Sequence, residues 1–335
     1  MPSAGPAAQL AISRPCLLSR DLGPVLPRGN PPVALRHRTL MGGVGVPPEA
    51  YFAEQRSQFH AGLLLGGTLS VGADGVASNA DRASKLSRAL AGHVATALKV
   101  ETETERAAGQ TSGGQFEEAC ATFLDAAFTQ LRHLRPGEWT IHKVQSRRGV
   151  ASGVARYEQY SHLVDLAAAV ETNPKLAAIL GNAYAIAPDI VVSRAPINDD
   201  EINAHRFLVD DTVATHASLR ASVQPNPLLH AVVSCKWTLR SDRAQNARSE
   251  ALNLIRNRKG RLPHVVVVTG EPTPVRISSL ALGTGDIDCV YHFALPELVA
   301  AVRDKGGEDT KELLDMMIEG KRLKDIADLP LDLAV

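Results

Sequence analysis

Three short stretches of the chain contain residues whose types suit the hydrolysis of a phosphodiester. They are Pro188-Asp189, Ser234-Cys235-Lys236 and Glu250. Metal-assisted hydrolysis needs a carboxylate that holds a hard divalent cation, a positive group near the scissile phosphate, and a second acid. Asp189, Lys236 and Glu250 would supply these three groups. Magnesium keeps several of its own waters and needs only one or two carboxylates, so this small acidic set is sufficient.

Taken alone, this pattern does not identify a nuclease. An aspartate next to a proline is common in turns, and a single lysine on a strand commonly lies at a solvated edge. The residues that follow Lys236 favour the nuclease interpretation, because they predict a helix rich in basic side chains.

The sequence around Lys236 predicts a strand, a short polar turn and a helix. The strand covers 230–237 and is expected to be half-buried, with Ser234 and Lys236 on the same face because strand side chains alternate. The helix is expected over 242–259, with its N-cap at the first of these residues. Glu250 lies beside the apolar stripe of this helix, so its carboxylate can turn towards the strand.

Positive charge is concentrated in this part of the chain. The whole protein has 36 basic and 36 acidic residues and is therefore neutral. Between residues 236 and 261 there are eight basic residues and two acidic ones, a local excess of six positive charges. A neutral protein with one basic element indicates a local site for a polyanion. The eight basic residues are Lys236, Arg240, Arg243, Arg248, Arg256, Arg258, Lys259 and Arg261.

The turn Arg240-Ser241-Asp242-Arg243 is suited to reading G·C pairs in a major groove. Arginine can bind guanine O6 and N7 with two hydrogen bonds, and aspartate can accept one from the cytosine amino group. The alternative is an N-cap aspartate flanked by two solvated arginines. Without further information the turn alone favours that simpler interpretation.

Composition indicates a globular protein with one large domain or two ordinary ones. The 335 residues are 44% hydrophobic and 21% charged, which is enough for a sizeable core. No apolar run approaches the length of a membrane span, and the N-terminus lacks a signal pattern, so a cytoplasmic protein is expected. Residues 1–48 are rich in Pro, Gly and Arg and are expected to form a disordered or loosely packed extension.

The cysteines do not indicate a metal site. They form no CxxC pair, and the chain has no HExxH motif, so zinc is not expected. Free thiols and a reducing compartment are expected instead. The four cysteines are Cys16, Cys120, Cys235 and Cys289.

Hydrophobic periodicity predicts strands that alternate with helices, which indicates an α/β fold with helices on both faces of a sheet. The helices are expected over 50–64, 84–100, 115–134, 157–170, 174–180, 199–204, 242–259, 277–282 and most of 296–324. The strands are expected over 139–144, 186–192, 230–237, 264–269 and 286–293.

Several long runs resemble one known family. They are SCKWTLRSDRAQNARSEALNLIRNRKGRLPHVVVVT, then EPTPVRISSLALGTGDIDCVYHFAL, together with GQTSGGQFEEAC, APDIVVSR and GKRLKDIADLPLDLAV. They are similar to the NgoMIV-type restriction endonucleases, which are type II PD-(D/E)xK nucleases that recognise a CCGG core. The similarity extends from about Phe52 to Val335. It implies a restriction-endonuclease-like mixed central sheet flanked by helices, in a single endonuclease domain over 49–335.

The resemblance implies catalytic roles for five residues of matching type. Asp189 corresponds to the metal-binding aspartate of the PD pair, and Lys236 to the catalytic lysine. Ser234 stands where most of the superfamily has an acid, and the missing acid is supplied by Glu250 from the following helix. Glu117 corresponds to a further active-site acid.

The resemblance also implies the metal and the base contacts. Two Mg²⁺ ions per active site are expected, with the main-chain carbonyl of Cys235 completing a metal shell. Six positions match residues that contact bases. They are Arg240, Asp242 and Arg243 for the inner CCGG bases, Asp81 and Arg276 for the outer G·C pair, and Gln110 for a minor-groove contact.

The implied activity is double-strand cleavage of DNA at GCCGGC after the first base, which leaves four-base 5′ overhangs. Family members of this kind act as homotetramers built from dimers that hold two DNA copies, and a cognate DNA methyltransferase is an expected partner. The stretch before about Pro48 has no counterpart in the family.

Two other classes of protein share part of this set. A DNA-binding protein that does not cut would keep the turn 240–243 but would not need Asp189, Lys236 and Glu250 together. A structure-selective nuclease would keep the acids and the lysine but would not need base-reading arginines. The presence of both sets favours a sequence-specific nuclease.

Overall fold

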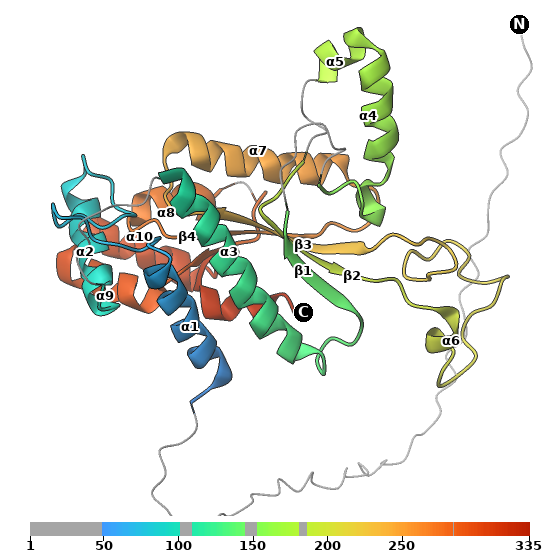
Figure 1. The fold of residues 1–335 in the computed structure, drawn as a ribbon, viewed down its shortest axis with the longest axis horizontal. Coiled ribbons are helices and arrows are strands. Elements are labelled where there is room, and N and C mark those ends of the chain that lie inside the picture. The colour runs from blue at the N-terminus through green and yellow to red at the C-terminus, as the bar shows by residue number, and fades with distance from the viewer. Residues whose placement is uncertain (1–48, 101–108, 145–152, 181–185, 284) are drawn as a thin grey trace, which may run out of the picture. The chain divides into compact units, whose positions relative to one another are not determined.

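The computed structural model describes residues 49–335, apart from 101–108, 145–152, 181–185 and 284 (Figure 1). The described residues belong to one compact unit, Pro48–Val335. The extension expected at residues 1–48 lies outside them. No helix among the described residues is long and apolar enough to cross a lipid bilayer.

A six-stranded mixed sheet forms the centre of the described fold. Its strands lie side by side in chain order, β1-β2-β3-β4-β5-β6. The pairs β1–β2 and β2–β3 are antiparallel, whereas β3–β4, β4–β5 and β5–β6 are parallel. The expected α/β class is therefore confirmed. The strands are β1 (Trp139–Lys143), β2 (Ile190–Arg194), β3 (Leu228–Lys236), β4 (His264–Thr269), β5 (Cys289–His292) and β6 (Leu323–Asp325).

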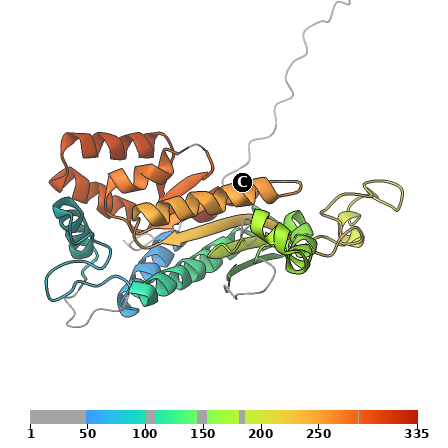
Figure 2. The same ribbon diagram turned by 90° about the horizontal axis from the view of Figure 1, so that it is seen from above.

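Helices cover both faces of the sheet. Figure 2 shows α7 on one side of β3 and α3, with α1 beside it, on the other. The described helices are α1 (Tyr51–Leu65), α2 (Lys85–Ala97), α3 (Gly109–Phe128), α4 (His162–Thr172), α5 (Pro174–Leu180), α6 (Asp199–Ile202), α7 (Ser241–Asn257), α8 (Pro274–Ala281), α9 (Leu295–Lys305), α10 (Glu308–Glu319) and α11 (Leu329–Asp332). Short 3₁₀ turns lie at Thr129–Leu131, Glu158–Tyr160 and Ile326–Asp328.

The sequence pattern predicted a half-buried strand here, but β3 is buried on both faces. Seven consecutive residues, from the second to the eighth of the strand, are buried. The alternation of side chains does hold, since Ser234 faces Glu250 of α7 and Cys235 lies beside Cys120 of α3. The buried polar residues of this strand have hydrogen-bond partners: Ser234 contacts Glu250 on α7, and His230 contacts the Leu333 carbonyl after α11.

Several expected element boundaries differ from the structure; the strand expected over 186–192, for example, is β2 at Ile190–Arg194. Helix α3 begins at Gly109 instead of residue 115, although glycines normally weaken a helix. Helix α7 has Arg240 as its N-cap, and Asp242 lies in its first turn. Strand β6 lies within a stretch that was expected to be mostly helix. It pairs along β5, so the tertiary partner rather than local propensity determines its conformation.

Helix α1 is fastened to the C-terminal part of the fold by a single arginine. Arg56 Nη2 lies 2.5 Å from Glu297 Oε2 on α9, and Arg56 Nε lies 2.9 Å from Asp325 Oδ1 on β6. All three side chains are largely buried, so the charges are paired where solvation is poor.

Candidate active site and adjoining pocket

The antiparallel pairing of β2 with β3 brings distant parts of the chain together. Ile190, the first residue of β2, lies opposite Val233, so Asp189 stands beside the C-terminal end of β3. Its Oδ2 atom accepts a hydrogen bond from the Cys235 main-chain N–H at 2.7 Å. The same oxygen accepts one from Lys236 Nζ at 3.0 Å. Asp189 and Lys236, far apart in sequence, are thus direct neighbours.

Glu250 approaches the same point from α7. Its Oε2 atom lies 3.4 Å from the hydroxyl oxygen of Ser234. Burial raises the pKa of Glu250, Lys236 acts against that rise, and the negative charge of Asp189 adds to it. The two carboxylates therefore lie close enough to repel each other, and the positive charge of Lys236 offsets part of that repulsion.

Lys236 is a protonated ammonium in this environment. Burial alone would lower its pKa, but the charges of Asp189 and Glu250 and the hydrogen bond to Asp189 raise it above the ordinary value. A lysine held in this state donates hydrogen bonds and positive charge, and it does not serve as a proton acceptor.

The main chain at the end of β3 is fixed from the other side by β4. The Lys236 carbonyl oxygen accepts hydrogen bonds from the Thr269 hydroxyl at 2.8 Å and from the Gly270 N–H at 3.2 Å. The Cys235 N–H is bound to Asp189, so the peptide groups before Cys235 and after Lys236 are both held in place. The backbone that carries Lys236 therefore has little freedom to shift.

Glu117 is not part of this carboxylate pair. It lies on α3, where its Oε2 is 3.0 Å from Lys143 Nζ at the end of β1. Lys143 also donates to the Gly114 carbonyl at 2.9 Å. The described residues contain no group of three or more His, Cys, Asp or Glu side chains close enough to share one metal ion. Glu117 therefore does not join Asp189 and Glu250 as a third ligand in this arrangement.

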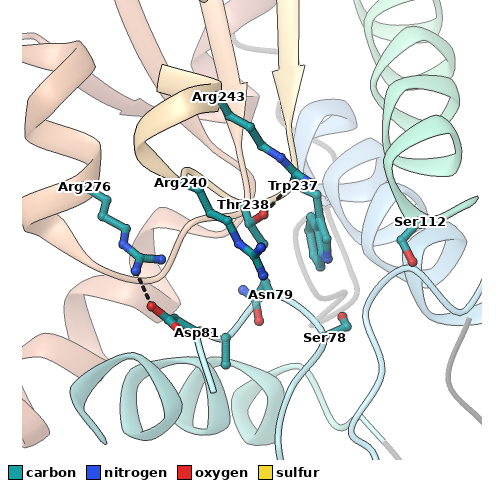
Figure 3. A pocket seen from close by; sticks show the side chains of 10 residues that line it. Ser78, Asn79, Asp81, Ser112, Trp237, Thr238, Arg240, Arg243 and Arg276 are labelled. Carbon is teal, nitrogen blue, oxygen red and sulfur yellow. Dashed lines mark hydrogen bonds and ion pairs between the residues drawn. The ribbon is translucent and has the colours of Figure 1, made fainter. Parts of the chain in front are cut away.

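A pocket of about 120 Å³ adjoins the end of β3. Figure 3 shows arginines converging on it from the start of α7 and from α8, opposite a loop that precedes α2. The lining residues are Ser78, Asn79, Ala80, Asp81, Ser112, Trp237, Thr238, Arg240, Arg243 and Arg276. Three cations and one carboxylate give this pocket an excess of positive charge, which suits an anionic or guanine-rich ligand.

Two contacts order the arginines of this pocket. Arg276 Nη2 and Asp81 Oδ2 form an ion pair (Figure 3). The pKa of Asp81 is lowered mainly by the hydrogen bond from the Ala83 N–H and next by the one from Arg276. Arg243 Nη1 donates to the Thr238 hydroxyl at 2.8 Å. Both arginines thus have defined directions before any ligand is bound.

Comparison with known proteins identifies the family. The sequence profile described as "NgoMIV restriction enzyme" matches residues 59–335. The chain is also 57% identical over 284 residues to "Type II restriction enzyme NgoMIV" of Neisseria gonorrhoeae, an alignment that covers 85% of this chain and 99% of that relative. The chain belongs to the NgoMIV restriction enzyme family. It is a type II restriction enzyme, a site-specific deoxyribonuclease, and its substrate is DNA.

Family membership decides between the alternatives that the sequence motifs left open. A restriction enzyme needs both a cutting site and a reading site, and the structure has a carboxylate–lysine cluster next to an arginine-lined pocket. The expected catalytic residues Asp189, Lys236, Glu250 and Ser234 are brought together, whereas Glu117 stands apart with its own lysine partner.

The residues expected to read bases are only partly gathered at the pocket. Arg240, Arg243, Asp81 and Arg276 all line the pocket. Asp242 is exposed in the first turn of α7 and is not among the lining residues. The side chain of Gln110, in the first turn of α3, lies outside the described part of the structure.

The residues of the candidate active site fit a hard divalent cation, which restriction enzymes generally require. Two carboxylates, Asp189 and Glu250, approach each other and repel, and a cation between them would relieve that repulsion. The main-chain carbonyl of Cys235 would add a third oxygen ligand. Magnesium favours such oxygen ligands and needs only one or two carboxylates. The thiol of Cys235 is buried against Cys120, and burial raises its pKa well above the ordinary value, so it is not a metal-binding thiolate.

Sequence reasoning missed residues that matter for this geometry. Lys143, Glu271 and Asn79 were not among the predicted site residues. Glu271 does leave a signal, because an acid directly follows the apolar run of β4. Lys143 leaves none, since its importance comes from the packing of α3 on β1.

Proposed function

We propose that this restriction enzyme cuts duplex DNA at GCCGGC after the first G, leaving four-base 5′ overhangs, by Mg²⁺-dependent hydrolysis. The observation that carries the proposal is the continuity of cutting and reading residues at the end of β3. Lys236 ends the strand beside Asp189, and Trp237, Thr238 and Arg240 already line the arginine pocket. A phosphate held at Lys236 would thus lie next to bases held at the pocket.

In this proposal Asp189, Glu250 and the Cys235 carbonyl hold the magnesium, with two ions per active site. Bound magnesium supplies an activated water and stabilises charge on the phosphate. Asp189 is oriented for this role by the Cys235 N–H, which leaves its other carboxylate oxygen available for a cation.

Lys236 holds its proton and directs it at the scissile phosphate. Its raised pKa keeps it cationic, so it stabilises negative charge that develops on the phosphate oxygens. Ser234, in place of the usual acid, makes room for Glu250 to reach the same point from α7. Glu117 acts as a further acid at the edge of the site, next to Lys143.

Base recognition is assigned to the two helices that meet at the pocket. Arg240, Asp242 and Arg243 at the start of α7 read the inner CCGG bases, and arginine binds guanine with two hydrogen bonds. Asp81 and Arg276 read the outer G·C pair as a preformed ion pair. A minor-groove contact is assigned to Gln110.

A homotetramer built from dimers is the proposed assembly. Its support is a segment between β2 and β3 that exposes large apolar side chains, which are 73% exposed at Phe207, 58% at Leu208 and 49% at Val213. Such a patch indicates a protein–protein contact.

The proposed domain is a single endonuclease domain over 49–335. It acts on DNA in the cytoplasm, where a cognate DNA methyltransferase is its expected partner.

The direct test is digestion of a sequenced plasmid with purified enzyme in magnesium, followed by sequencing of every new end. We expect each end to begin with 5′-CCGG and each cut to map to GCCGGC, with no product in EDTA. Ends at other sequences would refute the proposed specificity, and full activity in EDTA would refute the metal dependence.

A further inference from the structure

The loop Gly270-Glu271 joins β4 to α8 and makes contacts that neither the fold nor the cutting chemistry explains. Glu271 Oε2 accepts a hydrogen bond from the Leu239 main-chain N–H at 2.9 Å. Oε1 accepts from the Thr273 N–H at 3.2 Å and from the Thr273 hydroxyl. Arg276 Nη1 lies 3.7 Å from Oε2. One carboxylate thus contacts two separate chain segments.

Each of these contacts lies next to a residue that lines the arginine pocket. Leu239 directly precedes Arg240, the N-cap of α7. Thr273 is the N-cap of α8, which carries Arg276. Glu271 therefore links the start of one reading helix to the start of the other.

The third reading segment is tied to the same loop. Asn79 Nδ2 donates to the Gly270 carbonyl at 2.7 Å, and Asn79 lies two residues before Asp81. A side chain at residue 270 would overlap the indole ring of Trp237, so glycine is needed for this close approach. The three segments that carry the charged residues of the pocket therefore meet at residues 270 and 271.

The burial of Glu271 argues that this arrangement is not merely a means of stabilising the fold. Its side chain is fully buried, and burial raises its pKa despite the hydrogen bonds from Thr273 and Leu239. A buried carboxylate is costly, and an apolar residue at such a place is often as stable or more so. What a buried acceptor with several donors does supply is a defined geometry between those donors.

We propose that Glu271 is a positioning residue for sequence discrimination, which sets the spacing between the α7 arginines and the Arg276–Asp81 pair. A bidentate arginine–guanine contact tolerates little displacement, so loss of this spacing affects recognition of the inner and the outer base pairs together. The inference rests on the proposed function, because it takes those side chains as the base readers.

The test measures binding of four duplexes by variants made in a Lys236→Ala background, which prevents cutting. The duplexes contain GCCGGC, ACCGGT with the outer pair changed, GCATGC with the inner pairs changed, and an unrelated sequence. Glu271→Gln replaces one acceptor oxygen by an NH₂ group, so the side chain can accept from Leu239 or from Thr273 but no longer from both. Thr273→Val removes only the hydroxyl bond on the α8 side. Glu297→Gln is the matched control, since it removes a carboxylate that pairs with Arg56 away from the pocket.

We expect Glu271→Gln to lower discrimination against both changed duplexes by about tenfold or more, with affinity for the unrelated duplex unchanged. Thr273→Val should lower discrimination against the outer-pair change alone, and Glu297→Gln should lower neither. Equal loss of affinity for all four duplexes, or unchanged discrimination in a folded Glu271→Gln protein, would overturn the inference. If Glu271→Gln does not fold, full outer-pair discrimination by Thr273→Val overturns it.

The parent protein separates this inference from the proposed function. A Lys236→Ala protein with Glu271 intact that prefers GCCGGC supports the proposed function whatever the Glu271 variants do. A protein with Glu271 intact that shows no preference refutes the proposed function itself.

Discussion

Lys236 shows how one side chain can be both buried and cationic. Two carboxylates and a hydrogen bond to Asp189 outweigh the cost of burial and keep the ammonium protonated. The same contacts give Asp189 its direction. In the proposed mechanism, removing the lysine therefore changes the charge at the phosphate more than it changes the proposed base readers, which lie on other elements.

Lys236→Ala should abolish most cutting and keep site-specific binding. Loss of one group that stabilises transition-state charge typically lowers a rate on the order of 10²–10³-fold. Single-turnover cleavage and gel-shift binding of the same GCCGGC duplex measure the two effects. Lys324→Ala, which removes another ion-paired lysine from β6, is the control and should cut normally. Equal loss of binding and cutting in Lys236→Ala would contradict the assignment.

Arg243→Ala should lose discrimination more than total affinity. The guanidinium is exposed and held by Thr238, so its removal leaves the fold intact. A bidentate arginine–guanine pair is worth roughly 1–3 kcal/mol, and the loss should appear for the inner base pairs. Competition binding with duplexes altered at one inner pair measures it. Arg256→Ala, an exposed arginine in the last turn of the same helix, should leave discrimination unchanged.

At the scale of elements, the sequence predicted most strands and helices, because the apolar periodicity of the buried elements is strong. The exceptions are elements whose conformation is determined by contacts with a neighbouring strand. Helix α3 runs through Gly113 and Gly114, where propensity predicts an interruption, and the close approach of Lys143 to Gly114 fastens that turn to β1. Strand β6 is three residues long and exists because β5 offers it an edge.

The candidate site was also partly predictable, but from residue types and family resemblance rather than from periodicity. The residue types pointed to Asp189, Lys236 and Glu250, and the family resemblance supported them. The proximity of Asp189 and Lys236 follows from the antiparallel pairing of β2 with β3, whereas Glu250 reaches Ser234 from α7. The roles of these residues remain predictions. Lys143 and Glu271 could not be found from the sequence, since each matters only through atoms that are distant in the chain.

The prediction at the scale of elements concerns Lys143, which joins β1 to α3 through Glu117 and the Gly114 carbonyl. Lys143→Met removes both the Glu117 ion pair and the bond to the Gly114 carbonyl, so Glu117 loses its position at the edge of the site. We expect slower cleavage and a higher magnesium requirement, with unchanged affinity for DNA. Magnesium titration of the cleavage rate measures this. Lys143→Arg should restore part of the rate, and Lys311→Met, at a surface pair on α10, should have no effect.

At the scale of the whole molecule, two buried histidines link stability to pH. Burial lowers the pKa of His230 and of His292 from 6.5 to about 4. Between pH 6.5 and 4 these histidines bind protons in the unfolded chain but not in the folded protein. Their contribution to the free energy of unfolding is therefore complete above pH 6.5 and is lost as the pH decreases towards 4. The loss is on the order of 3 kcal/mol per histidine at most.

Urea unfolding at pH 7.5 and pH 5 measures this dependence. His230→Gln should reduce the difference in unfolding free energy between the two pH values, because glutamine can still donate to the Leu333 carbonyl but does not titrate. His133→Gln, at an exposed histidine on the surface, should leave the difference as it is. An unchanged difference in His230→Gln would exclude that histidine as a source.

The exposed apolar segment between β2 and β3 carries the prediction about assembly. Phe207→Ser with Leu208→Ser removes the two most exposed large apolar side chains of that segment. We expect a smaller sedimentation coefficient and normal folding, since neither side chain is in the core. Val275→Ser, which replaces an exposed apolar residue of α8, is the control. An assembly size that does not change would assign the contact to another surface.

The order of the strands has a consequence for how the protein is made. Because the sheet is laid down from β1 to β6 in chain order, each strand that leaves the ribosome finds the edge formed by the one before it. Asp189, Lys236 and Glu250 emerge before Arg276. The Lys236 peptide, however, lacks its hydrogen bonds until Thr269 and Gly270 have been synthesised. A chain interrupted before that point has Asp189, Lys236 and Glu250 on an unfinished sheet, and we expect such a fragment not to cut DNA.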